Sequence, residues 1–187
     1  LLPSQFEESL ETKAFTNGKS DRPLVNALYA RAFHNCFRHV FVLHYERLGW
    51  GDDEVLQLAR VLDAVVEPDR DAPKPDTALT TRRSTRAAQL NELYLMGNAF
   101  GDTAAIELLR AAAKLRGLSW LNLSENAGVG DSTFAHLTTA LKVKTNFKRL
   151  KELRLYGTAA SSSATDALRK VCSDRKITCC TERPTAD

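Results

Sequence analysis

Apolar residues recur along this chain at two spacings, a short one typical of strands and a longer one typical of helices. The clearest pattern is present twice, 28 residues apart, and consists of three leucines and an asparagine: Leu90, Leu93, Leu95 and Asn98, then Leu118, Leu121, Leu123 and Asn126. Leucines two positions apart point to the same side of a strand. A fixed period of this length indicates stacked strand–helix units.

Two weaker copies flank this pair. The downstream copy begins at Leu150 and has Thr158 in the asparagine position. The upstream copy begins at Val40 and has Leu48 in that position. Because Val40 precedes Leu90 by 50 residues, the chain carries an insertion, predicted at 67–89. Three of the six prolines lie between 68 and 85, without apolar periodicity, so the insertion is expected to be a loop.

Helical spacing follows each predicted strand. Its apolar positions are Ile106, Leu109 and Ala113 in one copy and Phe134, Leu137 and Leu141 in the next. Asp102 and Asp131 precede these runs, where a carboxylate would cap the helix or interact with its first amides. Parallel strands joined by helices are expected to cross over in the right-handed sense. For Asn98 and Asn126 we expect a structural role, pairing backbone groups in the turn after the strand.

The pattern L-x-x-L-x-L-x-x-N, with a helix in each unit, resembles the ribonuclease-inhibitor-like subfamily of leucine-rich repeats. The resemblance covers residues 40–180. It implies an α/β fold: a short right-handed solenoid of about four strand–helix repeats, with a parallel concave sheet and a helical N-terminal cap. The subfamily includes inhibitors, Ran GTPase-activating proteins, innate sensors and structural subunits. It implies protein–protein binding through the concave strand face and adjoining loops, and no catalytic motif transfers to this chain.

The pattern divides the chain into three parts. Residues 1–36 are expected to form an arm and a capping helix, with Leu24, Leu28 and Ala32 on one stripe against the first repeat. Residues 37–180 form the repeat domain, and 181–187 form a polar tail. A chain that begins with leucine is expected to be a piece of a longer or processed product.

Composition narrows the class of protein. Hydrophobic residues are 43% and charged residues 26% of the chain, which is typical of a soluble domain. No apolar run approaches the roughly 18 residues that span a bilayer, and no secretory leader is visible. The four cysteines include no C-x-x-C pair, which favours reduced thiols over a zinc site. We therefore expect an intracellular protein of the cytoplasm or an organelle lumen.

Candidate chemistry is sparse. The four histidines fall in no metalloprotease motif, and no nucleophile elbow or phosphate-binding loop occurs. The acidic run Asp52, Asp53 and Glu54 is explained by the preference of a helix N-terminus for negative charge. We predict no catalytic, cofactor-binding or metal-ligating residue, and hence a protein that is not an enzyme.

A basic segment at 142–151 holds five cations in ten residues. Together with the arginines at 82, 83 and 86 it could bind nucleic acid or an acidic membrane surface. A solvated loop before the fourth strand is the simpler interpretation. Phe147 is the only aromatic residue in the segment, too few for base stacking. Nucleic acid is therefore not favoured as a partner, while peripheral contact with a membrane complex stays open.

Alternation along the strands predicts an interaction surface. Residues beside the buried leucines face the concave side, and stacking brings His44, Tyr94, Asn122 and Arg154 into one column. Aromatic residues, arginine and methionine are enriched at interfaces. The predicted partner-binding residues are His44, Glu92, Tyr94, Met96, Trp120, Asn122, Glu152, Arg154 and Tyr156.

Three hypotheses about function follow. The leading one is a non-enzymatic protein–protein interaction scaffold, a structural or assembly subunit that binds other protein subunits. The alternative is a regulator of a small GTPase, which rests on family analogy. The third is a binder of nucleic acid or acidic membrane through the basic segment.

Overall fold

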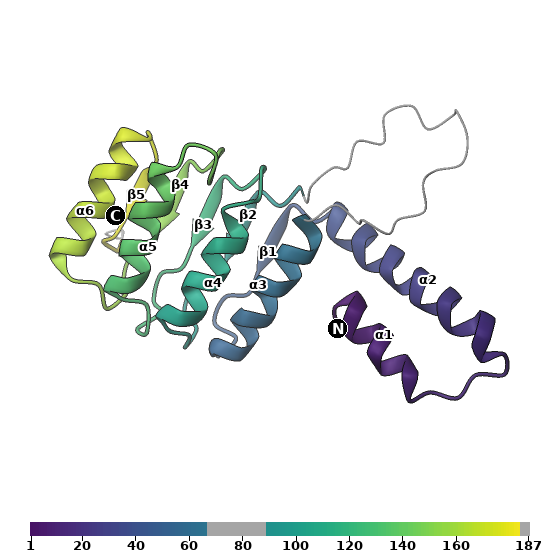
Figure 1. Ribbon diagram of the computed structural model, residues 1–187. Coiled ribbons are helices and arrows are strands. Elements are labelled where there is room, and N and C mark those ends of the chain that lie inside the picture. Colours follow the sequence, from purple (N-terminus) through teal and green to yellow (C-terminus); the bar gives the residue numbers. More distant parts are fainter. Residues whose placement is uncertain (67–88, 184–187) are drawn as a thin grey trace, which may run out of the picture.

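Five short strands lie side by side in the order in which the chain forms them, and every neighbouring pair is parallel (Figure 1). The computed structural model describes residues 1–66 and 89–183. The strands are β1 (Val42–His44), β2 (Glu92–Tyr94), β3 (Trp120–Asn122), β4 (Glu152–Arg154) and β5 (Thr178–Cys180). The fold is therefore α/β with an open parallel sheet, in which β5 follows the four strands predicted for the repeats.

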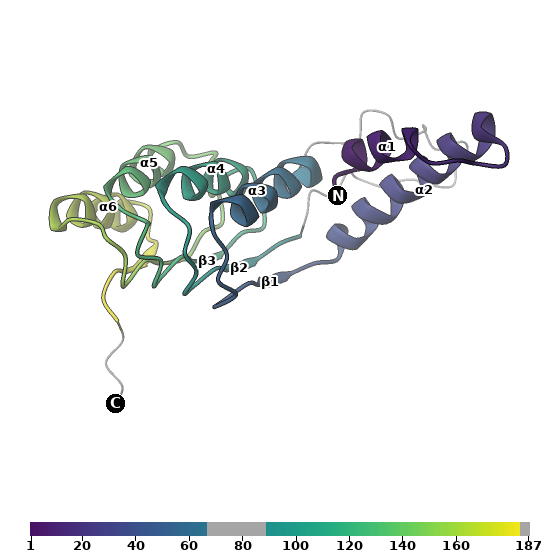
Figure 2. The same ribbon diagram turned by 90° about the horizontal axis from the view of Figure 1, so that it is seen from below.

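Helices cover one face of this sheet and leave the other uncovered, which we call the open face (Figure 2). The covering helices are α3 (Asp52–Val66), α4 (Asp102–Ala112), α5 (Asp131–Lys142) and α6 (Ser162–Asp174). Each follows a strand and leads to the next one, so strand and helix layers grow together along the chain.

The predicted register of the leucines is confirmed. Leu43, Leu93, Leu121 and Leu153 are aligned across β1 to β4, and Cys179 takes the equivalent position in β5. From Leu93 to Leu153 these side chains are fully buried between the sheet and the helices. Burial of a leucine contributes roughly 1.5–3 kcal/mol, so the core is a continuous row shared by neighbouring units.

The two asparagines pair backbone groups, as predicted. Asn98 accepts hydrogen bonds from the amides of Leu48 and Trp50 and donates to two carbonyls. Asn126 accepts from the Asn98 amide and donates to three carbonyls, while wholly buried. Thr158 donates only to the carbonyl of its own turn. The ladder therefore joins the first three units and ends at the fourth.

The aspartates cap helices, although not their own. Asp102 is the first residue of α4, but its carboxylate accepts hydrogen bonds from Gly130 and Thr133, at the start of α5. Asp52 bonds Gly101 in the same way, and Asp131 bonds Ser161. Each carboxylate thus satisfies amides of the next helix. The predicted first-turn positions of Asp102 and Asp131 are confirmed, whereas the helix that each carboxylate caps is the next one along the chain.

The N-terminal part is a helical hairpin of α1 (Pro3–Glu11) and α2 (Gly18–Arg38). Phe6 stacks on Tyr29 with ring centroids 3.9 Å apart, which holds the two helices together. Helix α2 starts earlier than the predicted stripe of Leu24, Leu28 and Ala32, and Pro23 lies inside it. Pro23 is the sixth residue of this helix and has no amide hydrogen, so it cannot donate to the carbonyl four residues earlier.

The expected packing of the capping stripe is wrong. Leu24 and Leu28 are 59% and 45% exposed, and α2 diverges from the sheet instead of lying across its end (Figure 2). Only the C-terminal end of α2 approaches the first unit, where Phe37 faces α3. The stripe pattern could not show this, because it does not reveal which surface an apolar face meets.

Two predicted segments are only partly within the described residues. Of the insertion at 67–89 only Gln89 is described, and residues 67–88 lie outside. Of the polar tail, Glu182 pairs with Arg169 and Arg183 pairs with Glu125, while 184–187 lie outside. In the described ranges no helix is long and apolar enough to cross a membrane.

Candidate interaction surface

The open face carries the predicted column of residues. Strand register aligns His44, Tyr94, Asn122 and Arg154, each beside an inward leucine. Because side chains alternate along a strand, these residues point away from the helices. Trp120 is aligned with Glu92 and Glu152 in the adjacent row of the same face.

Four of these side chains form a continuous row of stacked groups. The rings of His44 and Tyr94 are nearly parallel with centroids 4.5 Å apart. The rings of Tyr94 and Trp120 are tilted relative to each other, with centroids 6.3 Å apart. The Arg154 guanidinium lies over the Trp120 ring, 4.7 Å from its centroid. The row crosses all four predicted strands, and its members are joined by aromatic and cation–π contacts along it.

Carboxylates hold this row in place. The Tyr94 hydroxyl donates to Glu92 at 2.8 Å, and Arg154 Nε donates to Glu152 at 2.6 Å. Burial, together with the hydrogen bond to Glu92 and its charge, raises the pKa of Tyr94 to about 12. The hydrogen bond to Glu152 raises the pKa of Arg154 above its ordinary value. Tyr94 and Arg154 are thus fixed by neighbours on their own strands before any partner binds.

A second contact lies just beyond the ends of the strands, between two turns. The Tyr156 hydroxyl lies 3.2 Å from Met96 Sδ, joining the turn after β4 to the turn after β2. Tyr156 is 9% exposed, so it supports the surface from beneath and offers little contact area to a partner. Both residues were predicted for this face, and the structure brings them together.

Asn122 does not belong to the accessible surface. Its side chain is only 3% exposed, and its oxygen accepts a hydrogen bond from the Ser124 amide. The larger side chains of Tyr94 and Arg154 flank it in the register and leave it little solvent contact. The prediction that Asn122 contacts a partner is therefore wrong. At β3 the accessible group is Trp120.

The sequence missed an ion-pair cluster at the end of the strands. Glu125 accepts from Arg47 at 2.9 Å and also pairs with Arg183. Arg47 and Glu125 both have positive φ, at the turn position that glycine takes in the second and fourth units. The sequence did contain a signal for this cluster: Arg47 and Glu125 occupy the same position of the repeat as Gly97 and Gly157 do in the other two units.

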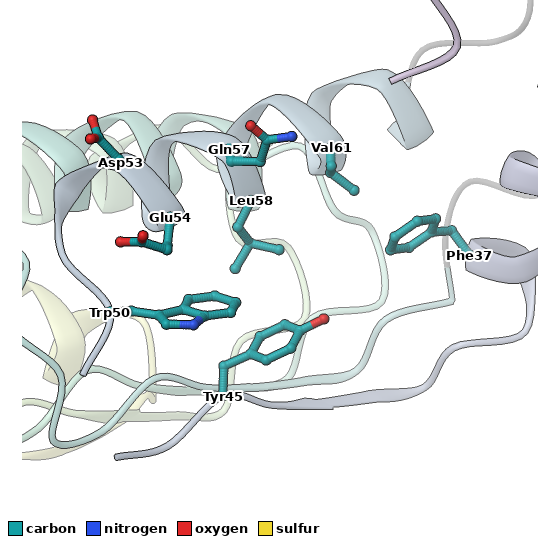
Figure 3. A pocket seen from close by; sticks show the side chains of 8 residues that line it. All are labelled: Phe37, Tyr45, Trp50, Asp53, Glu54, Gln57, Leu58 and Val61. Atoms are coloured by element: carbon teal, nitrogen blue, oxygen red, sulfur yellow. The ribbon is translucent and has the colours of Figure 1, made fainter. Parts of the chain in front are cut away.

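A second missed feature is an apolar cavity of about 440 Å³ at the free end of the sheet (Figure 3). Tyr45 and Trp50 stack below it at 4.4 Å, Leu58 points in from α3, and Phe37 faces them from α2. The cavity lies where a preceding unit would place its leucines.

The side chains that commonly bind metal ions are scattered over the described structure. In residues 1–66 and 89–183 no group of three or more histidine, cysteine or acidic residues could hold a metal ion. The four cysteines are free thiols.

The basic segment surrounds a polar hollow of about 540 Å³, near the start of β3 and β4. Lys148, Arg149 and Lys151 line it together with Asn91 and Ser119. The arginines at 82, 83 and 86, which were predicted to add to this patch, lie outside the described residues. Phe147 is fully buried, which removes the segment's only aromatic group from the surface.

No protein-family model matches this chain, and no curated protein sequence matches it.

Proposed function

We propose that this chain is a leucine-rich-repeat solenoid of the ribonuclease-inhibitor-like subfamily. The 28-residue period, the aligned leucines and the asparagine ladder support the proposal. In such a solenoid each unit buries its apolar face only against its neighbours. The open face would then be the concave one, on which repeat proteins display their binding residues.

Its function, we propose, is that of a non-enzymatic protein–protein interaction scaffold, a structural or assembly subunit of a larger complex. The observation that carries this proposal is the row of His44, Tyr94, Trp120 and Arg154 across the open face. Tryptophan, tyrosine and arginine are the residue types that most often dominate binding energy. A row of them on a parallel sheet is a surface rather than a pocket, which suits a macromolecular partner.

The fixed geometry of the row favours binding. Side chains that are already held by hydrogen bonds lose less conformational freedom on association. Glu92 and Glu152 provide that restraint for Tyr94 and Arg154. A partner would therefore meet a rigid aromatic strip, with His44 as its most solvent-exposed member.

The test compares variants in crosslinking mass spectrometry of complexes isolated gently from the native source. Trp120→Ala and Tyr94→Ala should keep the far-ultraviolet circular dichroism of the parent and lower partner affinity about thirtyfold or more each, as central interface residues do. Lys170→Ala, an exposed change on α6, is the matched control. If both aromatic variants retain partners as the control does, the open face is not the binding surface.

A second candidate function has one supporting observation. The hollow lined by Lys148, Arg149 and Lys151 could hold an anionic group of a nucleic acid or an acidic membrane. Fluorescence polarisation with mixed-sequence RNA and DNA, and sedimentation with vesicles containing phosphatidylserine, at low salt would test it. Absence of binding in both assays would remove this candidate.

The small-GTPase regulator remains a proposal by analogy, tested by GTP hydrolysis across a panel of small GTPases.

A further inference from the structure

Two cysteines lie side by side in the last unit of the fold, at the end of the sheet opposite the helical hairpin (Figure 1). Cys172 lies in the last turn of α6, and Cys179 is the middle residue of β5. In the register of the sheet, Cys179 takes the inward position that Leu153 holds in β4. Cys172 is fully buried in the hydrophobic core, and Cys179 packs against the same core from the strand side. Both thiols therefore face the layer between the sheet and the helices.

A tight turn between α6 and β5 brings these two residues together. The Cys172 carbonyl accepts hydrogen bonds from the amides of Arg175 and Ile177, at 3.1 Å and 2.8 Å. Lys176, between them, has a φ of +59°, the left-handed conformation in which many helices end. The chain thus reverses within a few residues, and β5 packs against the helix that precedes it.

The two thiols are in direct contact. Cys172 donates a hydrogen bond to the sulfur of Cys179, so the two sulfur atoms are neighbours. A disulfide forms without backbone movement only where the two Cβ atoms point toward each other, and side chains joined by a hydrogen bond meet that condition. Cys180, the next residue, alternates to the open face of the sheet and points away from Cys172. The contact therefore selects one pair among the four cysteines.

The surroundings make the two thiols unequal. The hydrogen bond from Cys172 and the positive charge of Arg169 lower the pKa of Cys179, although burial acts to raise it. The hydrogen bond to Cys179, together with burial, raises the pKa of Cys172. The thiolate is the nucleophile in thiol–disulfide exchange. Cys179 is also only partly buried, whereas Cys172 has no exposed surface, so Cys179 is the thiol that meets a reagent first.

We propose that Cys172 and Cys179 are a reversible disulfide site, which closes by exchange with a small-molecule disulfide such as oxidised glutathione. The Cys179 thiolate attacks one sulfur of the oxidant, forms a mixed disulfide and releases the other half as a thiolate. Cys172 then attacks Sγ of Cys179 and displaces the second half. Two electrons pass from the protein to the oxidant, and the protons of the two cysteines end on the two released thiols.

The bond fastens the edge strand β5 to the helix α6 and closes only the short turn between them. A cross-link of this kind stabilises a fold chiefly by restricting the unfolded chain. The pair faces the helices, on the opposite side of the sheet from the row of His44, Tyr94, Trp120 and Arg154. The disulfide site therefore neither requires the proposed scaffold function nor depends on it.

The first test is peptide mapping of the full chain after equilibration in mixtures of oxidised and reduced glutathione and alkylation of the remaining thiols. Trypsin cleaves after lysine and arginine, so it separates a peptide that starts at Val171 from one that starts at Ile177. The disulfide should join these two peptides, with a mass two hydrogens below their sum, and dithiothreitol should separate them. A parent in which these peptides stay unlinked across the whole range of mixtures overturns the proposal.

Two neighbouring serine substitutions identify the partner of Cys172. Cys180→Ser should give the same linked peptides as the parent, whereas Cys179→Ser should give none. Cys36→Ser, an exposed change on α2, is the control and should leave the linkage intact. Linkage that survives Cys179→Ser and is lost in Cys180→Ser would overturn the assignment. So would a glutathione adduct on Cys179 that persists without giving way to the internal bond.

Thermal unfolding supplies a second readout. Formation of the bond should raise the melting temperature by roughly 5 °C, as expected for a short closed loop in a chain of this size. Reduction should reverse the shift. Cys179→Ser, shown by circular dichroism to be folded, should melt at one temperature in all glutathione mixtures, and Cys180→Ser should shift as the parent does. An equal shift in both variants would show that the stabilisation does not come from this pair.

Discussion

Arg47 passes over Gly97 to reach Glu125, with its Nη2 atom 2.9 Å from the carboxylate. The contact joins the first strand–helix unit to the third across the second. A Cβ atom on Gly97 would lie 2.8 Å from Arg47 Cγ, closer than nonbonded carbons allow. Glycine at this position therefore serves the local turn, whose φ is +72°, and also the path of a neighbouring side chain.

This double role predicts the cost of Gly97→Ala. The left-handed backbone alone costs an alanine about 1 kcal/mol, and displacement of Arg47 adds about 1 kcal/mol more. Gly49→Ala is the matched control, since its φ is +70° but no atom lies within 4 Å of the added Cβ. Urea unfolding should show Gly97→Ala to be the more destabilising of the two.

A double-variant cycle isolates the contribution of the crossing. In an Arg47→Ala background, Gly97→Ala should cost no more than Gly49→Ala, because the obstructing side chain is gone. An unchanged difference between the two glycines in that background would contradict the contact and leave only local backbone strain.

Asn126→Ala should be among the most destabilising single changes in the chain. The substitution leaves the Asn98 amide and the Leu123 carbonyl without partners in a fully buried site, while the Leu95 and Ser124 carbonyls each keep one other donor. Unpaired buried groups cost about 1–3 kcal/mol each, so we expect a loss of at least about 2 kcal/mol in the free energy of unfolding. Asn146→Ala, which removes one long hydrogen bond of 3.4 Å, should cost less than about 1 kcal/mol and serves as control. Similar losses for the two variants would contradict the ladder.

The repeated leucines made most of the sheet predictable. A period of 28 residues fixes which residues of β2 and β3 are neighbours, and alternation then fixes which side chains share a face. For this reason the proximity of Tyr94 and Trp120 followed from the sequence, and so did the column that contains His44 and Arg154.

The repeat period does not show which other residues surround a given side chain. Asn122 has the right position for the open face, yet its flanking residues cover it. Asp102 has the right residue type for a cap, yet its carboxylate reaches the next helix because parallel helices begin side by side. The α2 stripe lacks a periodic partner altogether, so nothing in the pattern could show that Leu24 would be exposed.

Lowering the pH should weaken the link that the Asp102 carboxylate makes between α4 and α5. Burial acts to raise the pKa of Asp102, but the hydrogen bonds from Thr133 and Gly130 outweigh it and hold the pKa below the ordinary 3.8. A lowered folded-state pKa contributes stability that is present above the unfolded value and is lost as the pH falls through the folded one. Asp102→Asn should thus be less stable than the parent by about 1 kcal/mol at neutral pH. The difference should shrink below pH about 4.

The measurement is urea unfolding at several pH values from neutral to acidic. Asp53→Asn is the control, because Asp53 makes no hydrogen bond within the described residues and lies in the first turn of α3. A gap between the parent and Asp102→Asn that persists unchanged into strong acid would show that the carboxylate charge is not the source of the stabilisation.

Tyr94 should ionise late in an alkaline titration followed by tyrosinate absorbance. Its burial and its hydrogen bond to Glu92 raise its pKa to about 12, so one transition should lie near that pH and be absent from Tyr94→Phe. Glu92→Gln should lower the pKa of Tyr94, though not to its ordinary value, because burial persists when the negative charge is gone. A raised tyrosine pKa stabilises the fold below pH about 10 and loses that contribution as the pH rises towards 12. Glu107→Gln on α4 should leave the transition in place. If Glu92→Gln does so too, the hydrogen bond to Glu92 does not hold the proton on Tyr94, and the aromatic row lacks the restraint that makes it rigid.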